Sequence, residues 1–257
     1  MSIASPPQSA RAQLAALAAQ AESFAREGNA NGLWPELAGF PEVADARSAA
    51  VLILFGMLDT RPSDREAQAR AVSRDLDVLL LSRATTLRAH PGQVAFPGGR
   101  IDPGDASTVD AALREAREET GLDPAGVDVL GTLGTVPLPY SQHVVTPVLA
   151  WWQHPSPVRV VDLAESAHVF RAPVAELLDP ANRGSTVIRR GGREMRGPAF
   201  LVRRTPDEDG GRAGDRPADH HLVWGFTAVL LDGLFTRLGW TEPWDREREL
   251  PLELPAR

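Results

Sequence analysis

The sequence contains no cysteine among its 257 residues. Disulfide bonds, thiolate metal ligands and cysteine nucleophiles are therefore excluded. The chain also lacks an excess of basic charge, because 27 Lys and Arg face 34 Asp and Glu and leave a formal net charge of −7. Since no general positive field attracts a phosphate backbone, we expect no nucleic-acid partner.

Long apolar segments are missing as well. The longest apolar runs, such as residues 51–58, fall far short of the roughly 20 residues that a helix needs to cross a bilayer. The first residues do not show a basic region followed by an apolar run, which is the pattern of a secretory signal. We therefore expect a cytoplasmic protein with no membrane partner. Hydrophobic residues make up 43% of the chain, which is enough for a packed core.

Hydrophobic periodicity and turn residues predict strands that alternate loosely with helices, which favours a mixed α/β sandwich. The helices are expected at residues 9–27, 108–120, 173–178 and 222–238. The strands are expected at residues 51–57, 77–81, 94–96, 127–136, 144–152, 186–190 and 198–202. Residues 59–75 and 205–219 are polar, so we expect an outward connection and an exposed loop. We divide the chain into an N-terminal helical extension (1–45), a main domain (46–240) and a C-terminal tail (241–257).

Three glutamates mark the predicted helix at 108–120. Glu115, Glu118 and Glu119 lie at i, i+3 and i+4 and project from one side of that helix. Carboxylates so close together repel one another unless a cation lies among them, and Mg²⁺ or Mn²⁺ prefers such oxygen ligands. Arg114 and Arg117 can neutralise and orient the cluster. An isolated segment of this kind is more often a solvated helix with Arg–Glu pairs.

The two glycines that precede this helix favour a metal site over a solvated helix. Gly98 and Gly99 end a short predicted strand, where glycine lets a backbone carbonyl approach a ligand closely. From Gly99 to Leu122 the sequence resembles the Nudix box, G-x5-E-x7-R-E-U-x-E-E-x-G-U, in which U is apolar. It departs in its first half, where Asp105 replaces Glu and eight residues, not seven, precede Arg114. The resemblance implies a Nudix α/β/α sandwich with a mixed sheet.

A second motif lies upstream. Residues 79–99 are similar to the pattern L-L-T-x-R-[SA]-x3-R-x3-G-x3-F-P-G-G of the coenzyme A pyrophosphatase branch of Nudix hydrolases, and only Leu81 departs. The segment places Arg83, Arg88 and His90 in a local basic cluster, which suits the phosphates of coenzyme A. We count these three and Arg100 as substrate-binding candidates. Pairing with acidic neighbours that merely holds the loop is the alternative.

The resemblance implies a pyrophosphatase that uses Mg²⁺ or Mn²⁺. One to three ions would bind Glu115, Glu118, Glu119 and the carbonyl of Gly99, and would activate the attacking water. Coenzyme A would give 3′,5′-ADP and 4′-phosphopantetheine. The general base is either a carboxylate of the helix or Glu165, which is equally well read as a surface residue before a strand.

Two other functions stay open. The catalytic helix does not distinguish coenzyme A from another nucleoside diphosphate derivative, such as NADH or ADP-ribose. A non-catalytic nucleotide sensor is disfavoured, because all three glutamates are present and no helix-turn-helix is visible. The N-terminal helix and the C-terminal segment can also build a homodimer, which is compatible with catalysis.

Overall fold

The computed structural model describes residues 8–28, 33–34, 45–57, 62–86, 91–138, 141–204 and 220–252. Arg88, His90 and the expected loop at 205–219 lie outside these residues. In the part of the chain that is described, no helix is long and apolar enough to cross a membrane.

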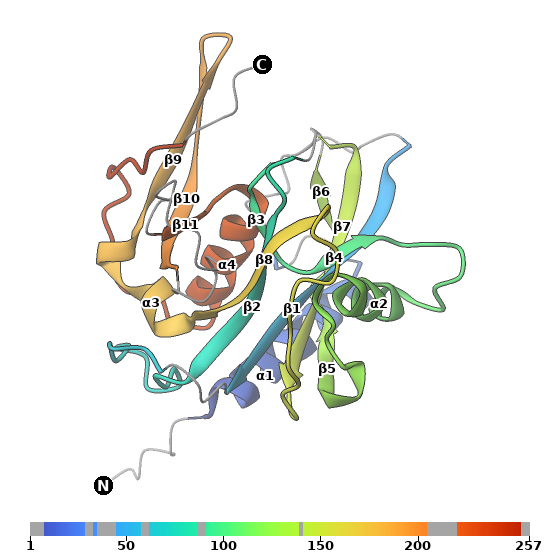
Figure 1. The fold of residues 1–257 in the computed structure, drawn as a ribbon. Helices are drawn as coiled ribbons and strands as arrows, with labels where there is room; N and C mark the ends of the chain where they lie inside the picture. The colour runs from blue at the N-terminus through green and yellow to red at the C-terminus, as the bar shows by residue number, and fades with distance from the viewer. Residues whose placement is uncertain are drawn as a thin grey trace, which may run out of the picture.

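Helices and strands alternate loosely, as the sequence predicts, but the strand at Ser166–Pro173 was not among the expected elements (Figure 1). The helices are α1 (Ala10–Arg26), α2 (Thr108–Thr120), α3 (Val174–Leu178) and α4 (Gly225–Arg237), with short 3-10 turns η2 (Pro124–Gly126) and η3 (Pro180–Asn182). The strands are β1 (Arg47–Met57), β2 (Leu76–Arg83), β3 (Val94–Ala95), β4 (Gly98–Arg100), β5 (Val127–Thr132), β6 (Val136–Leu138), β7 (His143–Trp152), β8 (Ser166–Pro173), β9 (Arg183–Arg190), β10 (Arg193–Arg203) and β11 (His220–Val223).

The main sheet is mixed, which confirms the predicted fold class. Its path runs β3-β2-β1-β7-β5, with β4, β6 and β8 paired to β1, β7 and β2. Strands β1 and β7 are parallel, and the other pairs in this sheet are antiparallel. A second, antiparallel sheet of order β11-β10-β9 packs against α4, and the β9–β10 hairpin extends away from the body in Figure 1.

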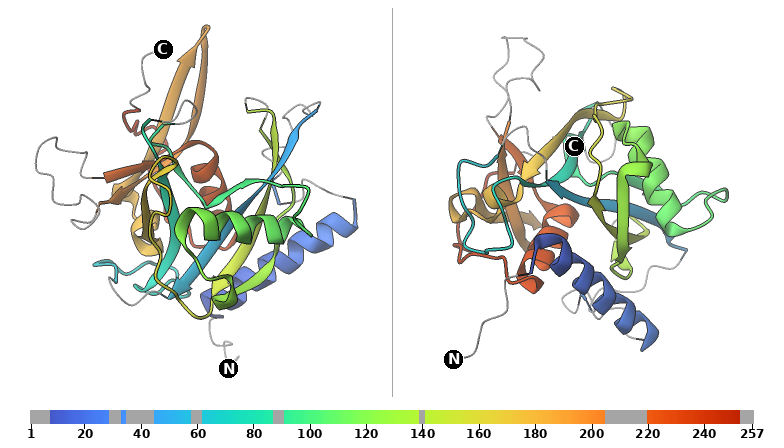
Figure 2. Two further views of the ribbon diagram at one scale, coloured as in Figure 1. Left: turned by 45° about the vertical axis from the view of Figure 1, so that its right-hand side comes forward. Right: turned by 90° about the horizontal axis from the view of Figure 1, so that it is seen from below.

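Helices cover both faces of the main sheet, which explains why β1 reads as a continuous apolar run. Leu52 and Leu54 pack with the alanines of α2 on one face. Ile53 and Phe55 pack with α1 and α4 on the other. Figure 2 shows α1 and α4 together on the side of the sheet opposite α2.

Strands β1 and β2 pair at only one end. Phe55 to Met57 pair with residues of β2, and beyond that point the two strands separate. Strand β3 then pairs with β2, and β4 pairs with β1, so the segment between them fills the opening. The amide of Leu52 donates to the carbonyl of Pro97 at 2.8 Å and fastens this segment to β1. The opening therefore lies where the glycine pair occurs.

Helix α2 is capped at both ends. Ser107 accepts a hydrogen bond from the amide of Asp110, and Gly121 ends the helix with φ 69°. Helix α1 likewise begins after Ser9, whose side chain accepts from the amide of Ala12. These local signals explain why both helices match their predicted bounds closely.

Strands β1, β9 and β10 begin at Arg47, Arg183 and Arg193, earlier than predicted, and two predicted elements are wrong in kind or in continuity. The helix expected at 222–238 begins only at Gly225, where φ is +65°, and the preceding residues form β11 instead. The strand expected at 127–136 is divided into β5 and β6, because Gly131 and Gly134 take positive φ and the register with β7 shifts near Gly131. In both places glycine permits a backbone conformation that interrupts the element.

Residues 62–75 pack on the domain and do not simply bulge outward. Ser63 is buried, and its amide donates to the carbonyl of Arg74. Arg65 forms an ion pair with the buried Glu242, whose carboxylate also accepts from the amide of Gln68 at 3.0 Å. The described C-terminal residues continue along β9, since the amide of Leu250 donates to the carbonyl of Ser185.

Candidate active site

Helix α2 presents the three glutamates to different surroundings. Its alanines, Ala112 and Ala116 among them, are fully buried against the sheet, so their small side chains bring the helix close to β1 and β4. Glu119 is 8% exposed, Glu115 is partly buried, and the side chain of Glu118 is 59% exposed. Burial therefore singles out Glu119 and Glu115 as the inner pair.

The glycine pair of β4 lies directly against these two carboxylates. The amide of Gly98 donates to Oε2 of Glu119 at 2.9 Å. A Cβ at Gly98, where φ is +155°, would lie 2.3 Å from the carbonyl oxygen of Ala50. A Cβ at Gly99 would lie 2.5 Å from the carboxyl carbon of Glu115. Backbone atoms thus exclude a side chain at Gly98, whereas a side chain at Gly99 would displace the flexible carboxylate of Glu115.

Arg114 links the box residues to one another. Its Nε and Nη2 donate to the two carboxylate oxygens of Asp105 at 2.8 and 3.0 Å, a bidentate pair. Nη1 donates to Glu115 at 3.0 Å and to Glu118 at 3.2 Å. Nη2 also donates to the carbonyl of Arg100. In this sequence Asp105 replaces the Glu of the Nudix pattern, and the loop before the helix is one residue longer. With this loop, the shorter Asp105 side chain still reaches Arg114.

The electrostatics differ across the site. Burial raises the pKa of Glu119 from 4.5 to about 7, against the hydrogen bond from Gly98, and the charge of Glu115 adds to the increase. Burial also raises the pKa of Glu115. The hydrogen bond from Arg114 lowers the pKa of Asp105 to about 2. The inner carboxylates therefore resist carrying negative charge together, whereas Asp105 stays ionised.

The carboxylates of Glu115 and Glu119 and the backbone carbonyl of Gly99 are the kind of oxygen ligands that a hard divalent cation prefers. Two partly desolvated carboxylates that disfavour their own charge lie beside a glycine backbone that no side chain shields. As the side chains lie, however, no three His, Cys, Asp or Glu among the described residues converge closely enough to hold an ion. Glu118 points to Arg114, so its carboxylate must leave that partner to join the other two.

Two residues from other segments act on this cluster. The charge of Arg83, at the end of β2, lowers the pKa of Glu119, and the charge of Glu165 raises it. Glu165 is exposed, and its carbonyl accepts from the amide of Ala84 at 2.8 Å, which places it next to the end of β2. Arg100 is exposed on β4 and contributes its carbonyl to Arg114. Whether Arg83 or Arg100 contacts a substrate stays a prediction.

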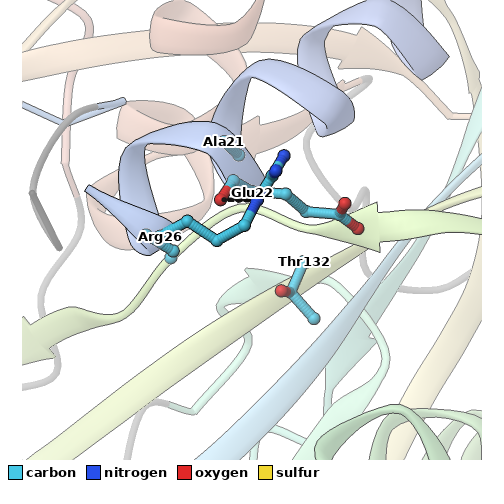
Figure 3. A pocket seen from close by; sticks show the side chains of 6 residues that line it. Ala21, Glu22, Arg26 and Thr132 are labelled. Atoms are coloured by element: carbon cyan, nitrogen blue, oxygen red, sulfur yellow. Dashed lines mark hydrogen bonds between the residues drawn. The ribbon is translucent and has the colours of Figure 1, made fainter. Parts of the chain in front are cut away.

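A separate pocket of about 330 Å³ lies away from this cluster. It lies between the end of α1 and the start of the β5–β6 connection, with Glu22, Arg26 and Thr132 in its wall (Figure 3). Because α1 covers the sheet face opposite α2, this pocket does not belong to the glutamate site.

Comparison with known proteins identifies the family. A model of the NUDIX domain matches residues 64–189. An uncharacterized Nudix hydrolase NudL of Cronobacter sakazakii is 37% identical over 162 residues, which cover 63% of this chain and 75% of that protein. The NudL of Salmonella paratyphi B is 35% identical over 198 residues, which cover 77% of this chain and 86% of that protein. The chain belongs to the Nudix hydrolase family. It is therefore an enzyme of the pyrophosphatase type, and Nudix hydrolases generally use divalent cations such as Mg²⁺ or Mn²⁺.

Solved structures resemble this Nudix hydrolase over part of the chain. The NUDIX domain of Shewanella oneidensis NrtR, complexed with ADP ribose, is 21% identical, and the match covers 55% of this chain and 83% of that one, with a TM-score of 0.38. A MutT/nudix family protein from Enterococcus faecalis is 17% identical over 86% of this chain and 74% of that one, with a TM-score of 0.41. Likenesses of this degree carry no argument about the substrate.

Proposed function

We propose that this Nudix hydrolase cleaves the pyrophosphate bond of coenzyme A or its derivatives to 3′,5′-ADP and 4′-phosphopantetheine. The observation that carries the proposal is that the upstream motif at residues 79–99 lies against the carboxylate helix of the Nudix box. Arg83 near the start of the upstream motif and Gly98 at its end both act on Glu119 of the carboxylate helix. A basic side chain beside a cluster of acidic ligands suits a substrate that carries phosphates next to a cation.

We assign the cation to Glu115, Glu119 and the Gly99 carbonyl, with Glu118 as a further ligand. Bound Mg²⁺ or Mn²⁺ supplies positive charge that neutralises the pyrophosphate and makes water a better nucleophile. The chain itself contributes the acidic ligands, the open backbone of Gly99 and the orientation that Arg114 imposes through Asp105. In this proposal the site residues Arg83 and Arg100, together with Arg88 and His90, bind substrate phosphates.

Glu165 is our candidate for the general base. It is exposed, its charge reaches Glu119, and its backbone is fixed to the end of β2. An exposed carboxylate beside the inner glutamates can accept a proton from water at the edge of the site. A carboxylate of α2 is the second candidate for this role.

Product identification tests the substrate. The enzyme is incubated with coenzyme A, NADH and ADP-ribose, with and without Mg²⁺ or Mn²⁺, and the products are identified by mass. We expect metal-dependent release of 3′,5′-ADP and 4′-phosphopantetheine from coenzyme A, at a higher kcat/KM than from the other two. Preferred cleavage of NADH or ADP-ribose would replace coenzyme A as the substrate while leaving the pyrophosphatase chemistry in place.

Substitution of Glu119 tests the site. Glu119→Gln keeps the shape of the side chain but removes its charge, so hydrolysis should fall at least about 100-fold under saturating Mg²⁺. The matched control is Glu194→Gln, which removes an exposed carboxylate on β10 and should leave turnover unchanged. Circular dichroism should show the same fold in both variants, and near-normal turnover of Glu119→Gln would defeat the assignment.

A further inference from the structure

The pairing of β2 with β8 is interrupted beside the glutamate cluster. Ser82 pairs with His168, but the next residue of β2, Arg83, pairs with Ser166. Ala167 is therefore an extra residue, and the register shift is a β-bulge. Bulges re-aim side chains and are common next to active sites.

The bulge decides which face Ser166 occupies. Leu80 and its partner Phe170 belong to the core on the side of α1 and α4, and in a regular strand Ser166 would lie on that same side. Leu79 and Arg83 are an even number of residues apart on β2, so their side chains lie on the same face. Leu79 belongs to the core on the side of α2. Because directly opposed residues of antiparallel strands share a face, the bulge places Ser166 beside Arg83 on the α2 side.

A donor and an acceptor are buried here without partners. Ser166 is 1% exposed. Its Oγ and the Nε of Arg83 are both buried, and neither makes a hydrogen bond within the described residues. Buried polar atoms almost always find partners, so two such atoms on opposed residues need an explanation. They are complementary, since the Nε–H of Arg83 can donate and the hydroxyl oxygen of Ser166 can accept.

The main chain on both strands is already fixed. The amide of Arg83 donates to the carbonyl of Gln93 at 3.0 Å, and the amide of Ala84 donates to the carbonyl of Glu165 at 2.8 Å. The guanidinium of Arg83 is thus the part that can change its orientation. Its charge already acts on Glu119, so it lies within electrostatic reach of one carboxylate proposed to hold the cation.

We propose that Ser166 is a positioning residue for Arg83. Its hydroxyl accepts a hydrogen bond from Nε of Arg83 in the substrate complex, and the terminal nitrogens of the guanidinium then bind a phosphate oxygen beside Glu119. Guanidinium nitrogens bind phosphate in a fixed fork geometry, so holding Nε sets the direction of that fork. The inference rests on the proposed pyrophosphate chemistry but not on the identity of the nucleotide.

A double-mutant cycle tests this inference. Binding of the non-hydrolysable probe adenosine 5′-(α,β-methylene)diphosphate is measured by calorimetry in Mg²⁺ for the wild type, Ser166→Ala, Arg83→Gln and the double variant. We expect Ser166→Ala to weaken binding about tenfold, which is about 1.4 kcal/mol, and to have no further effect once Arg83 is replaced. Ser166→Thr keeps the hydroxyl and should restore most of the affinity.

A second buried serine separates positioning from stability. Ser185→Ala removes a hydroxyl that donates to the carbonyl of Arg246 at 2.7 Å in the second sheet, and it should lower the melting temperature without changing affinity for the probe. Equal losses from Ser166→Ala with and without Arg83, a Thr variant no better than Ala, or a wild type that does not bind the probe would each overturn the inference.

Hydrolysis assays distinguish failure of the proposed pyrophosphatase function from failure of the proposed role of Ser166. If wild-type enzyme cleaves no pyrophosphate substrate but the cycle shows coupling, the proposed function fails and the positioning of Arg83 stands. Normal hydrolysis together with additive effects would remove the role of Ser166 alone.

Discussion

The guanidinium of Arg114 binds three acidic residues of the box, Asp105, Glu115 and Glu118, but not Glu119. Two of its nitrogens donate to Asp105, and the third donates to both Glu115 and Glu118. Since the guanidinium is planar and rigid, fixing one edge on Asp105 also fixes the edge that faces the glutamates. We therefore propose that Asp105 acts on the site by orienting Arg114.

Removing the charge of Asp105 should misalign this arrangement. We expect Asp105→Asn to lower kcat about 10- to 100-fold, because outer partners of metal ligands typically have effects of this size. The control is Asp102→Asn, which alters a 62% exposed carboxylate that lies 3.8 Å from Nη2 of the same arginine. It should change kcat less than about twofold. Equal losses in steady-state kcat from the two variants would contradict the bidentate role.

Asp77 is a buried carboxylate outside the site, and its pKa predicts a pH effect on stability. Burial raises the pKa of Asp77 from 3.8 to about 7, and Oδ1 accepts no hydrogen bond within the described residues. The unfolded chain loses this proton near pH 4, whereas the folded protein keeps it until about pH 7. Asp77 therefore removes stability progressively as the pH rises from 4 to 7.

Asp77→Asn should abolish this loss. The variant should be more stable than the wild type by about 2–4 kcal/mol above pH 7, and the difference should shrink toward pH 4. Urea unfolding at several pH values measures it. A difference that does not change with pH would show that Asp77 keeps its ordinary ionisation in the folded protein.

At the scale of elements, the site depends on how closely α2 approaches β4. Alanines on the inner face of α2 allow that approach, and glycines on β4 leave room for the glutamates that follow them on the helix. The opening between β1 and β2 places β4 beneath the helix, because β1 can pair with β4 only where β2 has separated from it. Two elements thus form the acidic site with backbone on one side and carboxylates on the other.

Gly99→Ala should disrupt the site with little effect on the fold. Its Cβ would lie 2.5 Å from the Glu115 carboxyl carbon, so this flexible side chain must move away. We expect hydrolysis to fall about 100-fold or more, with the circular dichroism spectrum preserved. Gly104→Ala is the matched control, since nothing lies within 4 Å of its Cβ and its φ is not positive. Full turnover by Gly99→Ala would show that hydrolysis does not depend on the position of the Glu115 carboxylate.

In the molecule as a whole, one partly buried ion pair joins segments that are distant in the sequence. Arg65 pairs with Glu242 and also donates to the carbonyl of Ala175 at 3.0 Å, so it connects the 62–75 segment, α3 and the C-terminal segment. Glu242 is 1% exposed. A charge buried to this extent is tolerated only while its partner remains.

Arg65→Ala should therefore lower the free energy of unfolding by about 3 kcal/mol. The comparison is Arg203→Ala, which removes an exposed ion pair with Asp64 at 3.9 Å and should cost less than about 1 kcal/mol. Chemical denaturation measures both variants. Similar small losses in the two would show that the segments are held by packing and not by this pair.

Local sequence signals were enough to predict helix α2 and the carboxylates that it carries. Ser107, Gly121 and the spacing of Glu115, Glu118 and Glu119 act through neighbours within a few residues, so a helix with three carboxylates on one side follows from local geometry. The glycine pair likewise signalled a close backbone approach. The same local reasoning was wrong about the start of α4, because the extended conformation of β11 depends on its pairing with β10.

The burial of each carboxylate and its hydrogen-bond partners depend on the folded chain. Glu118 and Glu119 are adjacent in the sequence, yet Glu118 is exposed and Glu119 is buried against the backbone of β4. The bidentate contact of Asp105 with Arg114 and the bulge that turns Ser166 toward Arg83 also arise from chain segments that meet only on folding. Burial and strand register depend on such distant segments, whereas helix periodicity depends on residues a turn apart.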